Sequence, residues 1–343
     1  MKDKKKDNPN EEEILDPEQK ICDPHHHLWD APKQRYLLDE LLDDLGSGHN
    51  VLSTVYMECG SMYRHSGSEA MKPVGEIEFV NGVAAMGNSG IYGSIRPCAS
   101  IVGLADLTLG EKVLDVLDAQ IEASPRFVGI RHASGWDPSS SIRNSHTTPT
   151  RGLLGDKKFR KGCAQLKKRS LSFDAWLYHP QISELTNLAR AFPEQTIILD
   201  HFGGPLGIGP YARDRQAVFE SWKTSIKELA GCENVLAKLG GLAMPINGFG
   251  FHKRNTPATS AELMKENAHY YHYMLETFGT SRCMFESNFP VDKVSCSYSV
   301  LWNSFKAMTR AYSSSEKDSL FHDNAAHTYK VTNNLSKTGG LLE

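Results

Sequence analysis

The amino-acid sequence predicts an α/β fold, specifically a single (β/α)8 TIM barrel with long loops between its strands and helices. Short apolar runs recur along the chain, and each ends in a polar or ionisable residue. A Gly- or Pro-rich loop and then a helical stretch follow each run, an order that is typical of parallel sheets. Eight such runs within about 270 residues fit an eight-stranded barrel, in which the active site lies at the C-terminal ends of the strands.

The eight runs predict the barrel strands. From the amino end they cover residues 21–23, 51–58, 97–103, 127–130, 171–177, 196–200, 235–239 and 283–286. The side chains at or just after their ends are His25, His27, Glu58, Asp106, Arg131, His132, Tyr178, His179, His201, Lys238, Glu286, Ser287, Asn288 and Asp292. Because these ends meet at one mouth, the set predicts an active site there. Taken singly, Asp106, His132 or Tyr178 is equally consistent with a strand end that meets solvent.

Helices are predicted between the strands from the spacing of apolar residues. They cover residues 107–123, 180–192, 215–231 and 261–278, and the aromatic residues of the last one are expected to pack in the core. Three loops, at 59–75, 133–152 and 240–260, exceed the usual length of about 2 to 6 residues for such connections. Long loops on this side of a barrel usually shape and cover the substrate.

One barrel domain is expected over residues 21–331. Residues 1–20 are mostly charged and polar and lack the apolar core of a signal peptide, so they are interpreted as a disordered leader, and 332–343 as a loose C-terminal tail. Seven cysteines without a Cys-x-x-Cys motif argue against disulfides or a thiolate zinc site and favour a cytoplasmic protein.

The bulk charge restricts the class of partner. A formal net charge of -3 indicates neither a nucleic-acid-binding nor a membrane-surface patch, and no apolar run reaches the roughly 18 to 20 residues of a membrane span. The expected partner is a small-molecule substrate. The sequence carries no signal for an organic cofactor, and a homo-oligomer remains open.

The stretch Ile21-Cys-Asp-Pro-His-His-His-Leu-Trp29 is the strongest local signal. Residues i and i+2 of an extended segment point to the same side, so His25 and His27 can converge on one point. On a helix the same spacing would place them roughly 200° apart. The alternative is a turn of surface histidines, which the apolar run before the motif and Trp29 after it make less favourable.

These motifs resemble the amidohydrolase superfamily, within it the amidohydrolase 2 group, and there the lactonases that open 2-pyrone-4,6-dicarboxylate and sugar-acid lactones. The matching pieces are Asp23-Pro-His-His-His-Leu-Trp29, Phe127-Val-Gly-Ile-Arg-His132, Leu199-Asp-His-Phe-Gly-Gly-Pro205, Lys238-Leu-Gly-Gly-Leu242, Met284-Phe-Glu-Ser-Asn-Phe-Pro290 and Asn324-Ala-Ala-His-Thr-Tyr329. The resemblance implies that His25, His27 and His201 line the reaction centre. There they would bind a divalent metal, zinc or manganese, or polarise a carbonyl directly, and the sequence leaves both modes open.

The sequence departs from the family pattern after the eighth strand. Asn288 occupies the position at which the family usually carries the aspartate that activates water, and a neutral amide cannot act as a general base. We therefore expect Asp292, or else Glu58 or a histidine, to take this role. Asp292 is equally consistent with a helix N-cap.

The predicted reaction is hydrolysis of a lactone of a small carboxylated or sugar-derived acid. Arg131 and Lys238 are candidates to hold a substrate carboxylate, with hydrogen bonds from Tyr178 and His179, whereas a structural ion pair with Glu58 is the alternative for these cations. Two other functions remain open: metal-dependent, non-oxidative decarboxylation of a small acid, and binding of a small acid without conversion.

Overall fold

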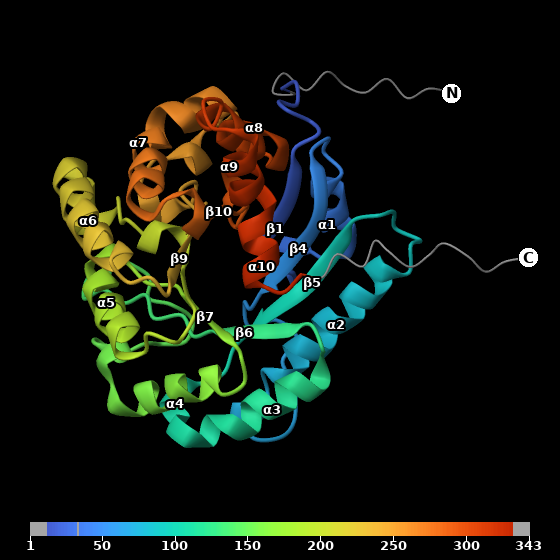
Figure 1. Ribbon diagram of the computed structural model, residues 1–343, viewed down its shortest axis with the longest axis vertical. Coiled ribbons are helices and arrows are strands. Elements are labelled where there is room, and N and C mark those ends of the chain that lie inside the picture. The colour runs from blue at the N-terminus through green and yellow to red at the C-terminus, as the bar shows by residue number, and fades with distance from the viewer. Residues whose placement is uncertain (1–11, 33, 332–343) are drawn as a thin grey trace, which may run out of the picture.

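The computed structural model describes residues 12–32 and 34–331, and its main feature is a sheet of eight parallel strands. In spatial order these are β1 (Lys20–His26), β4 (Asn50–Met57), β5 (Arg96–Gly103), β6 (Phe127–Arg131), β7 (Ser172–Ala175), β8 (Ile197–Leu199), β9 (Val235–Leu239) and β10 (Cys283–Phe285). Each coincides with one predicted run. The prediction of a (β/α)8 barrel is confirmed, and Figure 1 shows the helices arranged around the outside of the strands.

Ten α-helices are assigned within the described residues. They are α1 (Leu38–Leu45), α2 (Val74–Asn88), α3 (Val113–Ala123), α4 (Lys157–Lys167), α5 (Ile182–Ala191), α6 (Arg215–Ala230), α7 (Ser260–Phe278), α8 (Tyr298–Met308), α9 (Ser314–Asp318) and α10 (Asn324–Thr328). The four predicted helices correspond to α3, α5, α6 and α7, with a 3-10 turn at Leu107–Lys112 before α3. Thr259 and Glu262 form a reciprocal capping box at the start of α7, which fixes where that helix begins.

The first loop of the barrel contains an element that the sequence did not predict. A short antiparallel hairpin, β2 (Trp29–Ala31) and β3 (Gln34–Tyr36), follows the histidine motif directly. Its strands are only three residues long, too short for a readable alternation of apolar and polar residues. The hairpin places Trp29 beside His27, with ring centroids 5.9 Å apart.

The predicted leader extends too far into the chain. Residues 12–20 lie against the barrel: the backbone N–H of Leu15 donates to Asn303 Oδ1 over 2.9 Å, and that of Ser260 donates to Glu12 Oε1 over 2.7 Å. These hydrogen bonds to α7 and α8 explain how a mostly polar segment is held. The remaining leader residues 1–11 and the predicted tail 332–343 lie outside the described residues.

The barrel closes between β1 and the segment after β10. The backbone N–H of His27 donates to the carbonyl of Phe289 over 2.8 Å, and that of Asn288 donates to the carbonyl of His25 over 2.9 Å. The buried carboxylate of Asp23 accepts a hydrogen bond from the N–H of Ser287 over 3.0 Å. The seam of the barrel is therefore formed by the residues that carry the histidine motif.

Apolar side chains fill the space between the strands and the surrounding helices. Tyr270, Tyr271 and Met274 of α7 are buried there, which confirms that the aromatic residues of this helix belong to the core. Among the described residues, no helix is both long enough and apolar enough to cross a membrane.

Candidate active site

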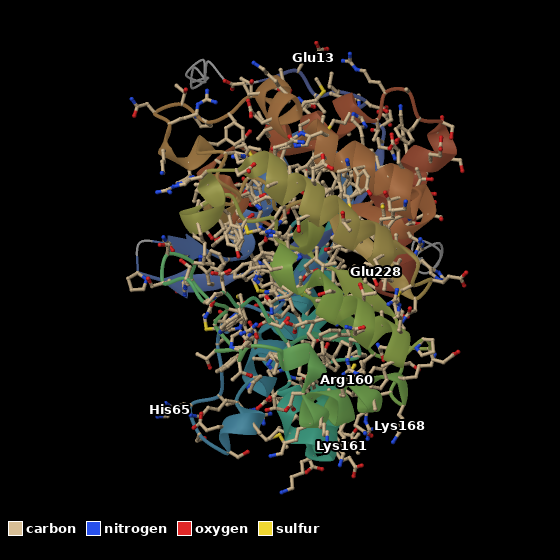
Figure 2. All side chains as sticks on the ribbon, turned by 90° about the vertical axis from the view of Figure 1, so that its left-hand side faces the viewer. Glu13, His65, Arg160, Lys161, Lys168 and Glu228 are labelled. Carbon is tan, nitrogen blue, oxygen red and sulfur yellow. The ribbon has the colours of Figure 1, made fainter. Side chains whose placement is uncertain are left out.

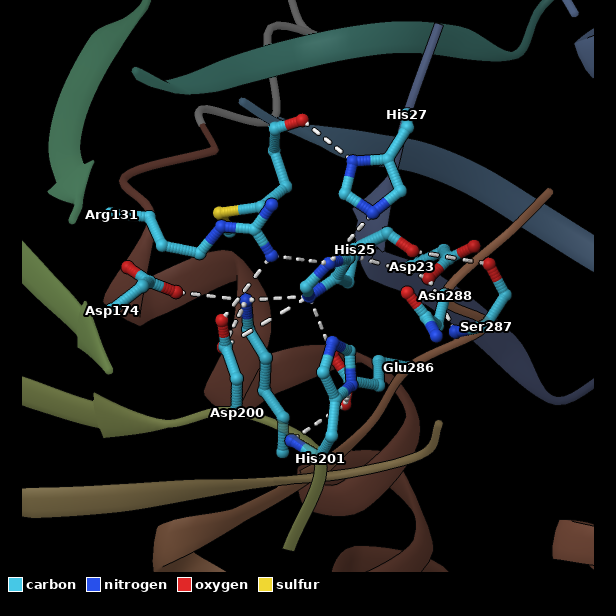
Figure 3. Close-up of polar contacts among 12 residues, drawn as sticks. Asp23, His25, His27, Arg131, Asp174, Asp200, His201, Glu286, Ser287 and Asn288 are labelled. Carbon is cyan, nitrogen blue, oxygen red and sulfur yellow. Dashed lines mark hydrogen bonds and ion pairs between the residues drawn. The ribbon is translucent and has the colours of Figure 1, made fainter. Parts of the chain in front are cut away.

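Three histidines converge at the C-terminal mouth of the barrel. His25 Nε2 lies 3.3 Å from His27 Nε2, and the ring centroids of His25 and His201 are 4.4 Å apart. His25 and His27 come from the end of β1, where the extended backbone points both side chains the same way. His201 follows β8. Figure 3 shows His25 at the centre of the group, with His27 and His201 on either side.

The tautomer of His27 follows from its hydrogen bond. Its Nδ1 lies 2.9 Å from the carbonyl oxygen of Met57, which can only accept, so Nδ1 carries the proton. Nε2 of the neutral ring then presents a lone pair to His25. Burial lowers the pKa of both imidazoles well below the usual range, and the charges of Lys238 beside His25 and of Arg131 beside His27 lower it further.

The carboxylate of Glu286 contacts two of these histidines, His25 and His201. One carboxylate oxygen lies 2.6 Å from His201 Nδ1 and the other lies 2.8 Å from His25 Nδ1. The side chain is fully buried at the end of β10. Because the carboxylate accepts the Nδ1 proton of His201, Nε2 of that ring is left with a lone pair, an arrangement that is common for metal-binding histidines.

Two glycines after β9 make room for this group. A Cβ atom at Gly240 would lie 2.4 Å from Glu286 Cγ, and one at Gly241 would lie 2.5 Å from His201 Nδ1. Gly241 also has a positive φ of 78°. The Gly-Gly pair is therefore required by the close approach of Glu286 and His201.

Lys238 forms a buried ion-pair network with Asp174 and Asp200 next to His25. Its Nζ lies 2.8 Å from Asp174 Oδ1, 3.2 Å from Asp200 Oδ1 and 3.4 Å from His25 Nδ1, and all of these side chains are fully buried. Burial opposes the lysine charge, but the two aspartates outweigh it and raise the pKa of Lys238. Tyr329 donates to the same oxygen of Asp174.

Arg131 is likewise engaged by the protein. Its Nε lies 2.7 Å from Glu58 Oε1, and its Nη1 lies 3.3 Å from His25 Nε2. The other oxygen of Glu58 lies 3.1 Å from Nε2 of His146, which is carried by the long loop after β6. Burial alone would raise the pKa of Glu58, but Arg131 and His146 outweigh it and lower that pKa to about 2.

A cavity of about 350 Å³ opens over these residues. His27, His201, Arg131 and Asn288 face it from the barrel, and Trp29 and Trp176 form apolar walls. The residues of the loop after β6 that line it are Arg143, Asn144, Ser145 and His146. The long loop therefore contributes to the substrate cavity.

Not every predicted site residue reaches this cavity. Tyr178 lines it, but its hydroxyl donates to the backbone carbonyl of Arg143, so it supports the loop. Glu58 and Lys238 are fully buried behind Arg131 and His25. His179 does not line the cavity; it is buried, and its Nδ1 accepts the N–H of Leu206 over 3.2 Å.

Asp292, which the sequence analysis favoured for activating water, lies behind Asn288. It is fully buried and accepts a hydrogen bond from Asn288 Nδ2 over 3.2 Å. Asn288 has a positive φ of 55°, a backbone conformation that asparagine tolerates better than most residues. Asn288 and Val291 line the cavity, whereas Asp292 does not.

Glu286 was named among the strand-end residues but given no role, and Asp200, His146 and Trp176 were not selected from the sequence. Glu286 and Asp200 end predicted strands, and this position was a usable signal for both. Trp176 is the second-to-last residue of the predicted strand at 171–177. His146 lies in a loop without periodicity, and only the structure brings it to Glu58.

The donor set fits a divalent metal ion. Two nitrogens that each lie about 2.0–2.1 Å from a tetrahedral zinc are about 3.3 Å apart, which matches the separation of His25 Nε2 and His27 Nε2. His25, His201 and Asp200 also offer ligand atoms that lie within 4.8 Å of one another. A metal is therefore possible here, with His25 common to both arrangements.

Zinc added to chelator-treated protein is expected to stabilise the fold. At a free concentration of 100 times Kd, binding to the native state alone raises the free energy of unfolding by about 2.7 kcal/mol. The measurement is Tm as a function of zinc or manganese concentration. His27→Ala should lose most of this increase, whereas an equal increase in that variant would contradict the assignment of His27 as a ligand.

Comparison with known proteins places the chain among amidohydrolases. The family model described as amidohydrolase matches residues 22–331. The uncharacterized protein y4mH of Sinorhizobium fredii is 32% identical over 339 residues, which cover 91% of this chain and 98% of that protein. An L-fucono-1,5-lactonase of Burkholderia multivorans is 24% identical over 182 residues, covering 53% of this chain and 58% of the relative.

Solved structures share the fold at lower identity. A Burkholderia multivorans amidohydrolase with bound zinc has a TM-score of 0.69 at 19% identity and covers 90% of this chain and 99% of its own. A 5-carboxyvanillate decarboxylase of Novosphingobium aromaticivorans, complexed with manganese, has a TM-score of 0.58 at 11% identity and covers 92% and 97%. Since the family model spans nearly the whole barrel and one relative exceeds 30% identity over almost its full length, the chain belongs to the amidohydrolase family.

Proposed function

We propose that this protein hydrolyses a lactone of a small acid at the mouth of its barrel. The observation that carries the proposal is the convergence of three histidines: His27 and His201 line the cavity together with Arg131, and the buried His25 lies between the two rings. The similarity to L-fucono-1,5-lactonases favours a lactone over other substrates of this family.

The hydrogen bonds of the histidines favour one of the two modes that the sequence left open. His27 and His201 each place a proton on Nδ1, toward Met57 and Glu286, so neutral rings have no Nε2 proton to donate to a carbonyl. They are arranged to hold a cation. A bound divalent metal ion would polarise the lactone carbonyl and stabilise the negative charge that develops on its oxygen.

Other residues that line the cavity would bind and orient the substrate. The guanidinium of Arg131, fixed by Glu58, supplies a positive charge at the cavity wall for the developing oxyanion. Trp29 and Trp176 would enclose the apolar face of the lactone ring. Asp174, Asp200 and Lys238 hold the His25 ring from behind and do not contact the substrate in this proposal.

Arg143 is the best candidate to hold a substrate carboxylate. Arg131 and Lys238 already pair with buried carboxylates, whereas no carboxylate of the described residues lies within 4 Å of the Arg143 guanidinium. Arg143 also borders a second cavity, of about 690 Å³, which shares Trp29 and Val291 with the first. A substrate with an anionic group remote from the lactone carbonyl would extend toward it.

Arg143→Gln is expected to raise KM for carboxylated lactones by about tenfold or more, since hydrogen bonds to charged groups contribute about 1.5–3 kcal/mol. The kcat value should change little, because Arg143 contacts the substrate equally in the ground state and the transition state. Steady-state kinetics on matched neutral and carboxylated lactones would check this. An equal change of KM for both would contradict the role of Arg143 in binding an anion.

The proposed function is tested with purified protein and a panel of sugar-acid and aromatic-derived lactones. Hydrolysis releases one acid proton per turnover, which a pH indicator follows directly, and the reaction is expected to stop when a chelator removes the metal. The second candidate is non-oxidative decarboxylation, which the structural similarity to a manganese-containing decarboxylase favours. Carbon dioxide release from carboxylated aromatic acids, without acid release from any lactone, would overturn the first proposal in favour of the second.

A further inference from the structure

Lactone hydrolysis requires a group that accepts a proton and returns it, and the residue after the eighth strand that faces the cavity, Asn288, is neutral. Asn288 lines the cavity but cannot accept a proton, and Asp292 is buried behind it. Glu58 and Glu286 are fully buried and are held by Arg131 and by two histidines, respectively. The proton acceptor must therefore be sought among the other residues that line the cavity.

His146 lies on the wall of the cavity that the loop after β6 provides. Its side chain is 37% exposed, and it lines the cavity together with His27 and His201. Nε2 lies 3.1 Å from Glu58 Oε2, and Nδ1 makes no hydrogen bond with any residue in the described part of the chain. One ring nitrogen is therefore oriented by a carboxylate while the other is available to a ligand, which is how catalytic histidines are commonly held.

The loop that carries His146 is fastened to the barrel. The N–H of Ser145 donates to the carbonyl of Gly135 over 2.9 Å, and the N–H of Asp137 donates to Asn144 Oδ1 over 2.8 Å. The Tyr178 hydroxyl donates to the carbonyl of Arg143. These contacts hold the three residues that precede His146 and so restrict where its imidazole lies over the cavity.

The charges around His146 set its protonation. The hydrogen bond to Glu58 raises its pKa above the usual value, burial opposes this, and Glu76 and Arg131 act in opposite directions. His132 is the other titratable group that interacts with it. An imidazole held by a carboxylate at one ring nitrogen and free at the other is suited to both accepting and donating a proton.

We propose that His146, oriented by Glu58, is the catalytic acid and base of this enzyme. The inference rests on the lactone hydrolysis proposed above. As water attacks the carbonyl carbon and the new C–O bond forms, the π electron pair of the carbonyl moves onto its oxygen, and Nδ1 of His146 accepts one proton from the water. The double bond then re-forms as the bond between the carbonyl carbon and the ring oxygen breaks; the electron pair of that bond stays on the ring oxygen, and the imidazolium returns the proton to it. The product is the open hydroxy acid, and His146 ends neutral.

The experiment compares His146→Gln with the wild-type enzyme on whichever lactone the panel identifies. Loss of general acid and base catalysis is expected to lower kcat/KM by about 10²–10³-fold with little change in KM. His65→Gln is the matched control, since His65 is an exposed histidine on the loop after β4, where Figure 2 shows it at the surface. This control should retain wild-type kinetics, and both variants should keep the Tm increase with zinc.

Two further readouts separate catalysis from a structural role. Wild-type kcat/KM should rise with pH through the His146 pKa. Glu58→Gln removes the charge that raises this pKa, so the rise of kcat/KM should move to lower pH. His146→Gln should abolish the rise. Added imidazole should restore part of the activity of His146→Ala, because the free base fits where the side chain was.

The outcomes are distinguishable. An active wild type whose pH profile and kcat are retained in His146→Gln would overturn the role of His146 while leaving lactone hydrolysis intact. The role of His146 would also be overturned if its variants lost kcat but showed no rescue by imidazole and kept the wild-type rise of kcat/KM with pH. A wild type that opens no lactone would overturn the proposed function and this inference together.

Discussion

Replacing His27 by alanine is expected to lower kcat by about 10³-fold while leaving a folded barrel, because it removes a ring that lines the cavity and pairs with His25. His27 Nε2 lies 3.3 Å from His25 Nε2, a nitrogen that Arg131 Nη1 also approaches to 3.3 Å, so among the described residues the substitution leaves that nitrogen facing only the guanidinium. Steady-state kinetics on the best lactone, with circular dichroism to verify folding, are the measurements.

The control for this variant is His272→Ala, on the exposed face of α7, which should retain wild-type kcat. The alanine at position 27 leaves the Met57 carbonyl without its donor, a loss of about 1 kcal/mol of stability that denaturant unfolding can measure. A His27→Ala enzyme with more than a tenth of wild-type kcat would remove the histidine cluster from the mechanism.

Lys238→Met is expected to destabilise the fold by about 3–5 kcal/mol, because it leaves the buried carboxylate of Asp174 without its cation and Asp200 with only the more distant Arg131, whose Nη1 lies 3.7 Å away. Methionine matches the length of the lysine stem, so the loss arises mainly from charge and not from an empty volume. Chemical denaturation at pH 7 measures the change. Lys223→Met is the control at a partly exposed pair, since the contact of Lys223 with the exposed Glu220 should contribute less than about 1 kcal/mol.

The pH dependence of this loss has a defined sign. Burial raises the pKa of Asp174 to about 6 even with Lys238 present, and without that charge the pKa rises further. A carboxyl whose folded pKa lies above its unfolded value of about 3.9 loses stability as pH rises from the lower value through the higher one. Lys238→Met should therefore be closer to wild type at pH 5 than at pH 8, and an equal deficit at both would contradict the ion-pair explanation.

The strands and the histidine motif could be predicted from the sequence because their signals are local. β-Branched runs ending in polar residues mark β4 and β8, and the spacing of two places His25 and His27 on one side of β1. The mouth of the barrel then follows from the parallel order of the strands. The strands, the histidine pair and the location of the site can therefore be predicted without knowing which side chains are in contact.

The partners of these residues could not be predicted, because they are separated by long stretches of chain. Glu286 reaches His201 across 85 residues, and Lys238 reaches Asp174 across 64. For Arg131 and Lys238 the sequence left both substrate binding and a structural ion pair open, and the structure shows ion pairs with Glu58 and Asp174. The burial of Asp292 behind the side chain of Asn288, to which it is hydrogen-bonded, is likewise a tertiary contact that the sequence does not reveal.

The seam between β1 and β10 has a consequence for synthesis of the protein. The backbone groups of His25 and His27 are held by Asn288 and Phe289, near the other end of the barrel sequence. A ribosome that has released the first seven strands has therefore produced every histidine of the site but not the residues that fix two of them. Catalytic competence should arise only when the last strand docks, so a nascent chain stays inactive until its barrel is whole.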